Sequence, residues 1–174
     1  MMSDEDPVPP GRQPPAEERI AHLARRAARG FSRSLQIRLA EHDITFGQWV
    51  FLRIMWDEEG LTQRELSERA NLTEPTTHTA LQKLEARGLV ERRNLRGNRR
   101  RQHAFLTEAG HALRSQLEPL AIEVNRVALH GLPEADCERL RDMLLTIIAN
   151  LDADERAEIS QGRRMPPTRA SAEG

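Results

Sequence analysis

Residues 92–107 read Arg-Arg-Asn-Leu-Arg-Gly-Asn-Arg-Arg-Arg-Gln-His-Ala-Phe-Leu-Thr, and this stretch decides the fold. Six arginines fall within its first ten residues, around a Gly-Asn pair and with no acid among them. Short apolar segments precede the cluster at 88–91 and follow it at 103–106. Two strands joined by a Gly-Asn turn form a hairpin, so the arginines are predicted at the tip of a hairpin.

Two short helical patterns stand directly before this hairpin. Thr62 can cap the first helix, and Glu65 three residues later closes a capping box. The second helix starts around Thr73, tolerates Pro75 in its first turn and ends at Gly88. Two short helices joined by a tight turn and followed by a basic hairpin have the layout of a winged helix-turn-helix.

Helical periodicity covers most of the remaining chain. Apolar stripes over 16–42 and 45–58 predict two helices, the second apolar on most faces and therefore central. Two more helices are expected at 108–130 and 133–151, and Pro119 is expected to bend the first of them. The predicted fold is mainly α-helical with a small β-hairpin wing.

The helices outside the motif carry more apolar surface than a small winged domain can cover. Pairing with a second copy is the simplest way to bury it, and a two-fold dimer would present two recognition helices to a palindrome. The expected organisation is a disordered N-terminal tail at 1–15, a dimerisation helix at 16–44, a winged helix-turn-helix domain at 45–107, dimerisation helices at 108–152 and a C-terminal tail at 153–174.

Charge is distributed unevenly along the chain. The totals of 26 basic and 27 acidic residues give a net charge of −1, so overall basicity does not indicate a nucleic-acid partner. The segment from Lys83 to Phe105, however, contains eight basic and two acidic residues, a local excess of six positive charges. Such a patch suits a phosphate backbone. An ordinary solvated surface is the alternative, although it usually mixes both signs.

Other function classes find little support in the sequence. The single cysteine, Cys137, has no internal disulfide partner, no apolar run approaches a membrane span, and the proline-rich acidic start is unlike a signal peptide. We therefore expect a cytoplasmic protein without a membrane partner. No metal-ligand spacing and no catalytic motif is present, so we expect no metal, no cofactor and no enzyme activity.

Three phrases of the chain resemble the multiple-antibiotic-resistance regulator (MarR) family of bacterial transcription factors. They are Leu-Thr-Gln-Arg-Glu-Leu at 61–66, Leu-Glu-Ala-Arg-Gly-Leu-Val-Glu-Arg-Arg at 84–93 and Leu-Thr-Glu-Ala-Gly at 106–110, and the resemblance covers about 20–151. It implies a triangular homodimer in which the N- and C-terminal helices interlock. Members of the family usually repress a nearby operon and release DNA when a small, often aromatic, ligand binds.

The second helix of the motif and the hairpin supply the predicted DNA contacts. Glutamine suits adenine and the threonine methyl suits thymine, which indicates an A·T-rich half-site. Asn98 stands where the family commonly has an acid, and Thr79 stands where it often has a basic residue, while Arg100 matches the family's minor-groove arginine. The predicted set is Thr62, Thr73, Pro75, Thr76, Thr77, His78, Thr79, Gln82, Lys83, Arg96, Asn98, Arg99, Arg100 and Arg101.

A ligand site is implied by the resemblance, between the dimerisation helices and the winged domain. An arginine beside an apolar pocket suits a carboxylate or phosphate, so the expected effector is an anionic aromatic acid or its coenzyme A thioester. The alternative is that the same side chains are only core. The candidate walls are Phe31, Leu35, Phe46, Trp49, Val50, Arg53, Met55 and Leu113.

Two further alternatives remain open at this stage. A winged helix can serve as a protein-interaction module, in which the basic hairpin would meet an acidic partner. A large apolar patch on the exposed face of 75–83 would favour that role, whereas the sequence places short polar side chains there. An activator of the same family is the other alternative to a repressor. Neighbouring acids disfavour a reactive thiolate at Cys137, so we interpret it as a structural thiol and not as an oxidant sensor.

Overall fold

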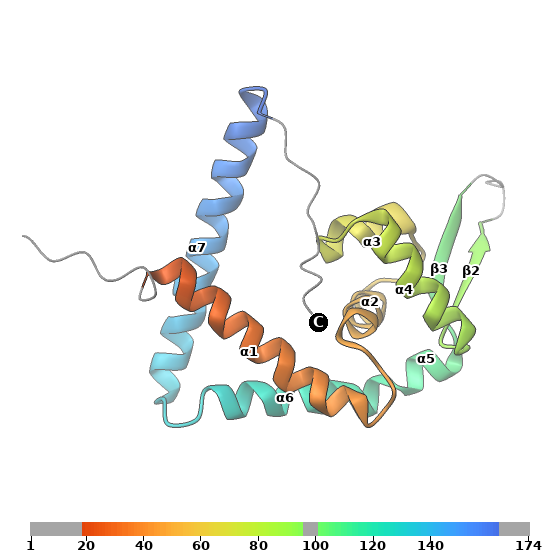
Figure 1. Cartoon of the computed structure of the whole chain (residues 1–174), viewed down its shortest axis with the longest axis horizontal. Coiled ribbons are helices and arrows are strands. Elements are labelled where there is room, and N and C mark those ends of the chain that lie inside the picture. Colours follow the sequence, from red (N-terminus) through yellow and green to blue (C-terminus); the bar gives the residue numbers. More distant parts are fainter. Residues whose placement is uncertain (1–18, 96–100, 164–174) are drawn as a thin grey trace, which may run out of the picture.

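The computed structural model describes residues 19–95 and 101–163, which form a mainly helical chain with a small sheet (Figure 1). The predicted fold class is thus confirmed, whereas the predicted tail at 1–15 lies outside the described residues. The elements, in chain order, are α1 Ile20–Ala40, α2 Phe46–Asp57, β1 Leu61–Thr62, α3 Gln63–Ala70, α4 Glu74–Ala86, β2 Val90–Asn94, β3 Gln102–Leu106, α5 Glu108–Ala112, α6 Arg114–Ala128 and α7 Glu134–Ser160.

Helix α2 forms the centre of the winged part. Its start is fixed by a capping box, in which Thr45 accepts from the backbone of Gln48 and the Gln48 side chain accepts from Thr45. Phe51 and Leu52 are fully buried, and α2 contacts α1, α3, α4 and β3. An apolar pattern on most faces of a helix indicates burial on most sides, and the structure places α2 accordingly.

Local capping chemistry delimits the two helices of the helix-turn-helix. The expected capping box of Thr62 and Glu65 is present at the start of α3, which ends at Asn71 in a left-handed conformation with φ of 51°. Thr73 then caps α4 by accepting from the backbone N–H of Thr76. Gly88, with φ of +67°, turns the chain from α4 into the wing.

The wing strands belong to an antiparallel sheet of order β1-β3-β2. Val90 pairs with Leu106 across the hairpin, and Leu61 pairs with Ala104 on the other side of β3. The strand β1 was not expected from the sequence, because a two-residue strand has no periodicity of its own. The predicted Gly-Asn turn falls between the described strands and lies outside the described residues.

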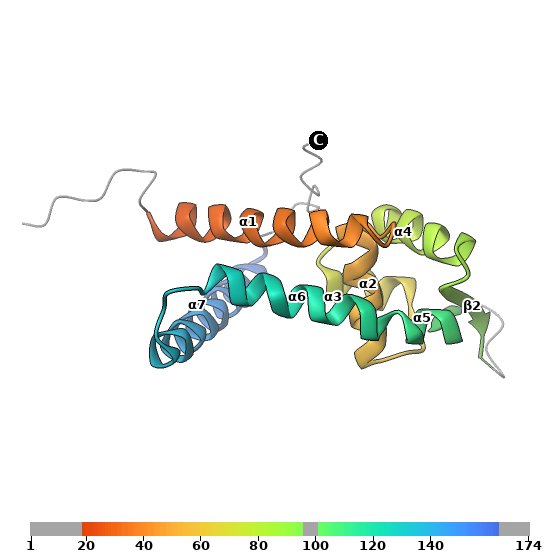
Figure 2. The same ribbon diagram turned by 90° about the horizontal axis from the view of Figure 1, so that it is seen from below.

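The long helices flank the winged part. Helix α1 runs alongside α6 (Figures 1 and 2), and the two are in contact. The helix expected over 108–130 is interrupted at Leu113, whereas Pro119 lies inside α6. Near this break the Gly110 carbonyl accepts a hydrogen bond of 3.0 Å from Trp56 Nε1, a tertiary contact that the sequence pattern does not encode.

Helix α7 is the least covered element. It extends to Ser160, so the segment from 153 to 160, predicted as tail, is helical instead. None of the residues of α7 is buried within the described part of a single chain. In Figure 1 it stands away from α2, α3 and α4, at the opposite side of the view from the wing.

Gly110 allows α5 to approach the wing closely. A Cβ at this position would lie 2.1 Å from the Leu89 carbonyl oxygen and 3.1 Å from Leu106 Cδ2. Gly110→Ala is therefore expected to lower the free energy of unfolding by about 2–3 kcal/mol in urea denaturation, because backbone has to move. The control is Gly30→Ala in α1, where nothing lies within 4 Å and where alanine should be neutral or slightly stabilising. Equal effects of the two substitutions would contradict this packing.

Candidate nucleic-acid interface

Helix α4 divides into a buried face and an exposed face. Thr77, Leu81 and Leu84 are fully buried and hold α4 against the core. The predicted DNA contact by Thr77 is therefore wrong: its position shares a helical face with Leu81 and Leu84, and its hydroxyl donates to the Thr73 carbonyl at 3.1 Å. The other predicted residues of this helix lie on its exposed face, namely Pro75, Thr76, His78, Thr79, Gln82 and Lys83.

Hydrogen bonds within the motif orient several of these side chains. Thr73 Oγ1 and Thr76 Oγ1 lie 2.9 Å apart, and the Thr79 hydroxyl donates to the Pro75 carbonyl at 3.0 Å. Gln63 Oε1 of α3 lies 3.0 Å from His78 Nδ1, and a carbonyl oxygen only accepts, so Nδ1 carries the proton in this contact. Gln63 was missed from the sequence, because its role depends on how α3 crosses α4.

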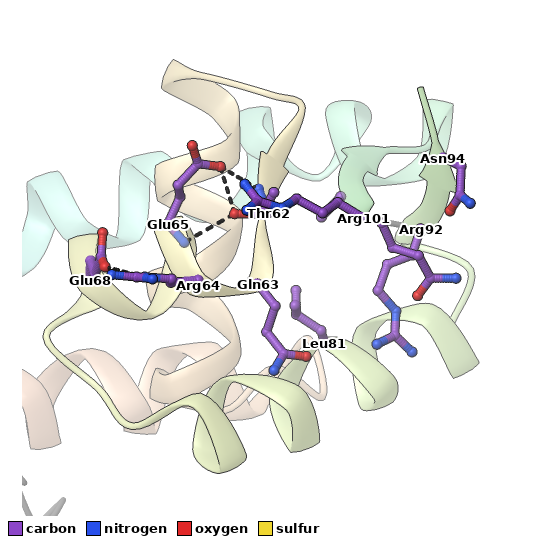
Figure 3. A pocket seen from close by; sticks show the side chains of 11 residues that line it. Thr62, Gln63, Arg64, Glu65, Glu68, Leu81, Arg92, Asn94 and Arg101 are labelled. Atoms are coloured by element: carbon purple, nitrogen blue, oxygen red, sulfur yellow. Dashed lines mark hydrogen bonds and ion pairs between the residues drawn. The ribbon is translucent and has the colours of Figure 1, made fainter. Parts of the chain in front are cut away.

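A cleft of about 840 Å³ opens between α3 and the wing (Figure 3). Side chains from both helices of the motif and from both wing strands line it, and three arginines lie along it. The cleft places Arg101, predicted as a phosphate contact, on the same surface as the predicted residue Thr62. The lining residues are Thr62, Gln63, Arg64, Glu65, Glu68, Leu81, Arg92, Asn94, Arg101, Gln102 and Ala104.

Part of the basic patch is engaged within the protein. Arg92 donates from Nη2 and Nε to Glu85 Oε2 at 2.6 and 3.1 Å, and its backbone N–H donates to Glu85 Oε1 at 3.3 Å. This pair ties the end of α4 to β2. The Arg93 guanidinium lies 4.1 Å from the centre of the Phe105 ring, a cation–π contact on the wing. Both guanidinium groups therefore have partners within the protein.

The remaining predicted basic residues divide into those that the structure describes and those that it does not. Arg101 and Lys83 are exposed, as phosphate contacts require. Arg96, Asn98, Arg99 and Arg100 lie outside the described residues, so their part in DNA binding remains a prediction.

The predicted ligand-site residues separate into two groups. Leu35 and Met55 are 5% and 1% exposed and belong to the core, and their contact with a ligand stays a prediction. The rest are partly buried around the core or exposed, namely Phe31, Phe46, Trp49, Val50, Leu113 and Arg53.

Three side chains of α2 come together in that second group. The Phe46 and Trp49 rings are stacked with centroids 6.1 Å apart, and the Arg53 guanidinium lies 5.6 Å from the Trp49 ring. Trp49 Nε1 is buried and has no hydrogen-bond partner among the described residues. A buried donor without a partner is costly, and a bound acceptor would relieve that cost.

Residues 19–95 and 101–163 lack two features that are typical of other classes of protein. No helix there combines the length and apolar character needed to cross a membrane. No group of three or more His, Cys, Asp or Glu side chains in these segments could hold a metal ion.

Known proteins resemble this chain in sequence and in structure. The MarR family model matches residues 42–101. The chain is 36% identical over 94 residues to the transcriptional regulator TtmR of Methylorubrum extorquens, a match that covers 54% of this chain and 48%, about half, of that relative. It is 27% identical over 140 residues to the transcriptional repressor NicR of Pseudomonas putida, covering 80% of this chain and 87% of NicR.

A solved structure agrees with these sequence matches. A MarR-family transcriptional regulator from Listeria monocytogenes, crystallised with a 26mer DNA, superposes with a TM-score of 0.72 at 25% identity. The alignment covers 86% of this chain and 99% of that protein.

The exposed face of α4, the preceding α3 and the adjoining hairpin define a winged helix-turn-helix protein. The match of residues 42–101 to the MarR family and the similarity of the chain to other transcriptional regulators agree with the resemblance of the phrases at 61–66, 84–93 and 106–110. Its relatives are regulators and not enzymes, in agreement with the sequence-based prediction.

The pairing of Glu85 with Arg92 leads to a pH-dependent prediction. Hydrogen bonds from Arg92 hold the pKa of the Glu85 carboxyl below its ordinary value of 4.5. The pair therefore stabilises the fold above pH 4.5, and this contribution is lost as the pH falls through the lower pKa of the folded state.

Glu85→Gln is expected to lower the free energy of unfolding at pH 7 by about 1 kcal/mol, a modest amount because the Glu85 side chain is 37% exposed. Urea denaturation should show the difference from wild type shrinking as the pH is lowered below 4.5. Glu91→Gln is the control, since the Arg93–Glu91 pair is 3.5 Å apart and mostly exposed. A difference that stays constant with pH would argue against the pair as its source.

Proposed function

We propose that this chain is a homodimeric, sequence-specific regulator that binds a palindromic operator and represses transcription from it. The observation that carries the proposal is the exposed face of α4, which presents short polar side chains beside an arginine-lined cleft. The major groove admits an α-helix, and its base edges are read by such side chains. The wing and the cleft would follow the phosphate backbone on either side.

The exposed surface of α4 favours DNA over a protein partner. A protein-interaction module would be expected to show a large apolar patch there. Thr76, Thr79 and Gln82 are exposed instead, while the apolar residues Leu81 and Leu84 are buried. We therefore prefer the DNA-binding proposal to that alternative. Repression is favoured over activation by the similarity to NicR, which is named a repressor.

The uncovered long helices support a dimer. Helix α7 has 27 residues with none buried within the described part of the chain, and residues 20–29 of α1 are all exposed. Isolated helices are marginal in water and large exposed apolar patches mark interaction sites. The exposed apolar side chains of α7 are Met143, Leu144, Leu145, Ile147, Ile148, Leu151 and Ile159. A second copy would cover this surface and place two α4 helices for two half-sites.

The contacts around Trp49 support a small-molecule effector. Its Nε1–H lacks an acceptor among the described residues, and the Arg53 guanidinium lies over the same ring. A donor and a cation beside stacked aromatic rings suit an anionic aromatic acid or its coenzyme A thioester. Binding at the junction of α1 and α2 would shift the dimer away from the arrangement that fits the operator.

DNA binding is predicted to be sensitive to salt and to single side chains. In gel shifts on the DNA upstream of its own gene, log affinity should fall with log salt by about 0.9 per phosphate contact. Arg101→Ala, which removes one contact per protomer, should make that slope shallower by about 2. Gln82→Ala should instead reduce the preference over competitor DNA, by about 1–3 kcal/mol per base contact.

Arg126→Ala is the control, because it removes an exposed charge in the last turn of α6, outside the winged part. A wild-type affinity that barely changes with salt would contradict the assignment of Arg101 and its neighbours. Smearing that competitor DNA removes would contradict sequence-specific binding.

Dimerisation is predicted to depend on the apolar face of α7. Ile148 is 53% exposed in the single chain, so Ile148→Asp leaves the winged part intact and burdens the proposed dimer with a buried charge. Sedimentation equilibrium should give a dimer for wild type and a substantial monomer fraction for the variant. Leu95→Asp is the matched control, since Leu95 is 44% exposed beside the wing. A monomeric wild type would refute the dimer.

Effector binding is predicted to need the indole N–H of Trp49. Isothermal titration with a panel of aromatic carboxylates and their coenzyme A thioesters should identify a binder. Trp49→Phe keeps an aromatic ring but removes the donor, so the affinity of that binder should fall by about tenfold, the worth of a hydrogen bond to a charged group. Absence of binding across the panel, or equal affinity in the variant, would remove this proposal.

A further inference from the structure

Arg87 lies between α4 and the wing, the two elements that are proposed to contact DNA. Helix α4 ends at Ala86, with Arg87 as its C-cap, and Gly88 turns the chain toward β2. The Arg87 side chain reaches the connection between α1 and α2. Its Nη1 donates to the Asp43 carbonyl and its Nη2 donates to the His42 carbonyl at 3.2 Å. These hydrogen bonds join the end of α4 to the connection between α1 and α2.

The two carbonyls are suited to a guanidinium. The backbone N–H groups of His42 and Asp43 donate to Leu39 and Ala40 at 3.0 and 3.1 Å, which continues the last turn of α1. Carbonyls at the end of a helix lack intrahelical donors and carry partial negative charge. A guanidinium holds its donors in a fixed fork and can reach two successive carbonyls, whereas an ammonium is a point charge.

The connection that Arg87 contacts is also held to α1 by hydrogen bonds. Gln36, in α1, accepts a hydrogen bond of 2.6 Å from the backbone N–H of Phe46, and its amide donates to the Ile44 carbonyl at 3.5 Å. Ile44 itself is 1% exposed and belongs to the core. Asp43 adopts a left-handed conformation with φ of 55°, which further defines the path of the chain. The position of α1 is thereby transmitted to the base of α4 and the wing.

We propose that Arg87 is a positioning residue that fixes the angle between α1 and α4, and with it the spacing of half-sites that the dimer accepts. The inference rests on the proposed function, because it requires two recognition helices bound to one operator. One inserted base pair moves a half-site by about 3.4 Å and rotates it by about 35°. A dimer with a fixed angle between α1 and α4 therefore binds operators of one half-site spacing, whereas a dimer with a variable angle binds operators of several spacings.

The test uses a duplex that wild-type protein selects from a random-sequence pool. Derivatives carry one or two base pairs inserted or removed at the centre, and fluorescence anisotropy gives the affinity for each at constant salt. The variants are Arg87→Lys, which keeps the charge but loses the fork, and Arg87→Gln. Arg69→Lys is the control, because Arg69 also makes an exposed contact between elements, at 2.6 Å from Glu58, but within the winged part.

Wild type and Arg69→Lys should prefer one spacing by at least about tenfold, and Arg87→Lys and Arg87→Gln should lose about tenfold of that preference. Melting temperatures should stay near that of wild type, since exposed hydrogen bonds contribute little to stability. The proposal is overturned if Arg87→Lys keeps the wild-type profile, or if its affinity falls equally at every spacing. Selection of no inverted repeat by wild type would refute the proposed function, and this inference with it.

Discussion

Helix α2 is packed on several sides, and the burial of its apolar side chains determines where the DNA-facing elements lie. Phe51, Leu52 and Met55 are at most 1% exposed, and α1, α3, α4 and β3 all contact this helix. Burying a large apolar side chain contributes about 1.5–3 kcal/mol. Packing therefore decides which face of α4 is exposed. Because Leu81 and Leu84 are buried against the core, the opposite face of the helix points outward.

A second layer of polar contacts sets the orientation of the wing and the long helices. The Glu85–Arg92 pair joins α4 to β2, Trp56 joins α2 to α5, and Arg87 joins α4 to the end of α1. Arginines that lie close together in the sequence thus have different surroundings in the structure. Arg92 and Arg93 have partners inside the protein, whereas Arg101 lies along the exposed cleft.

Features that depend on neighbouring residues were predictable from the sequence. The capping box of Thr62 and Glu65, the start of the second motif helix near Thr73, and the paired wing strands follow from residue type and spacing, and the structure contains them. Features that depend on distant contacts were not. The short strand β1, the contact of Gln63 with His78, and the break between α5 and α6 all require the packed fold.

The error at Thr77 has the same origin. Thr77 was grouped with its exposed neighbours, although its place on the face of Leu81 and Leu84 buries it. Periodicity shows which residues share a face, but packing decides which face the protein covers.

In the proposed complex, two α4 helices of a dimer read one palindromic operator. Hydroxyl-radical footprinting combined with methylation protection, on the DNA upstream of the gene and with wild-type protein, tests this arrangement. Two symmetric sets of protected major-groove positions are expected on one side of the duplex, about one helical turn apart. A single asymmetric footprint, or backbone protection without protected bases, would contradict it.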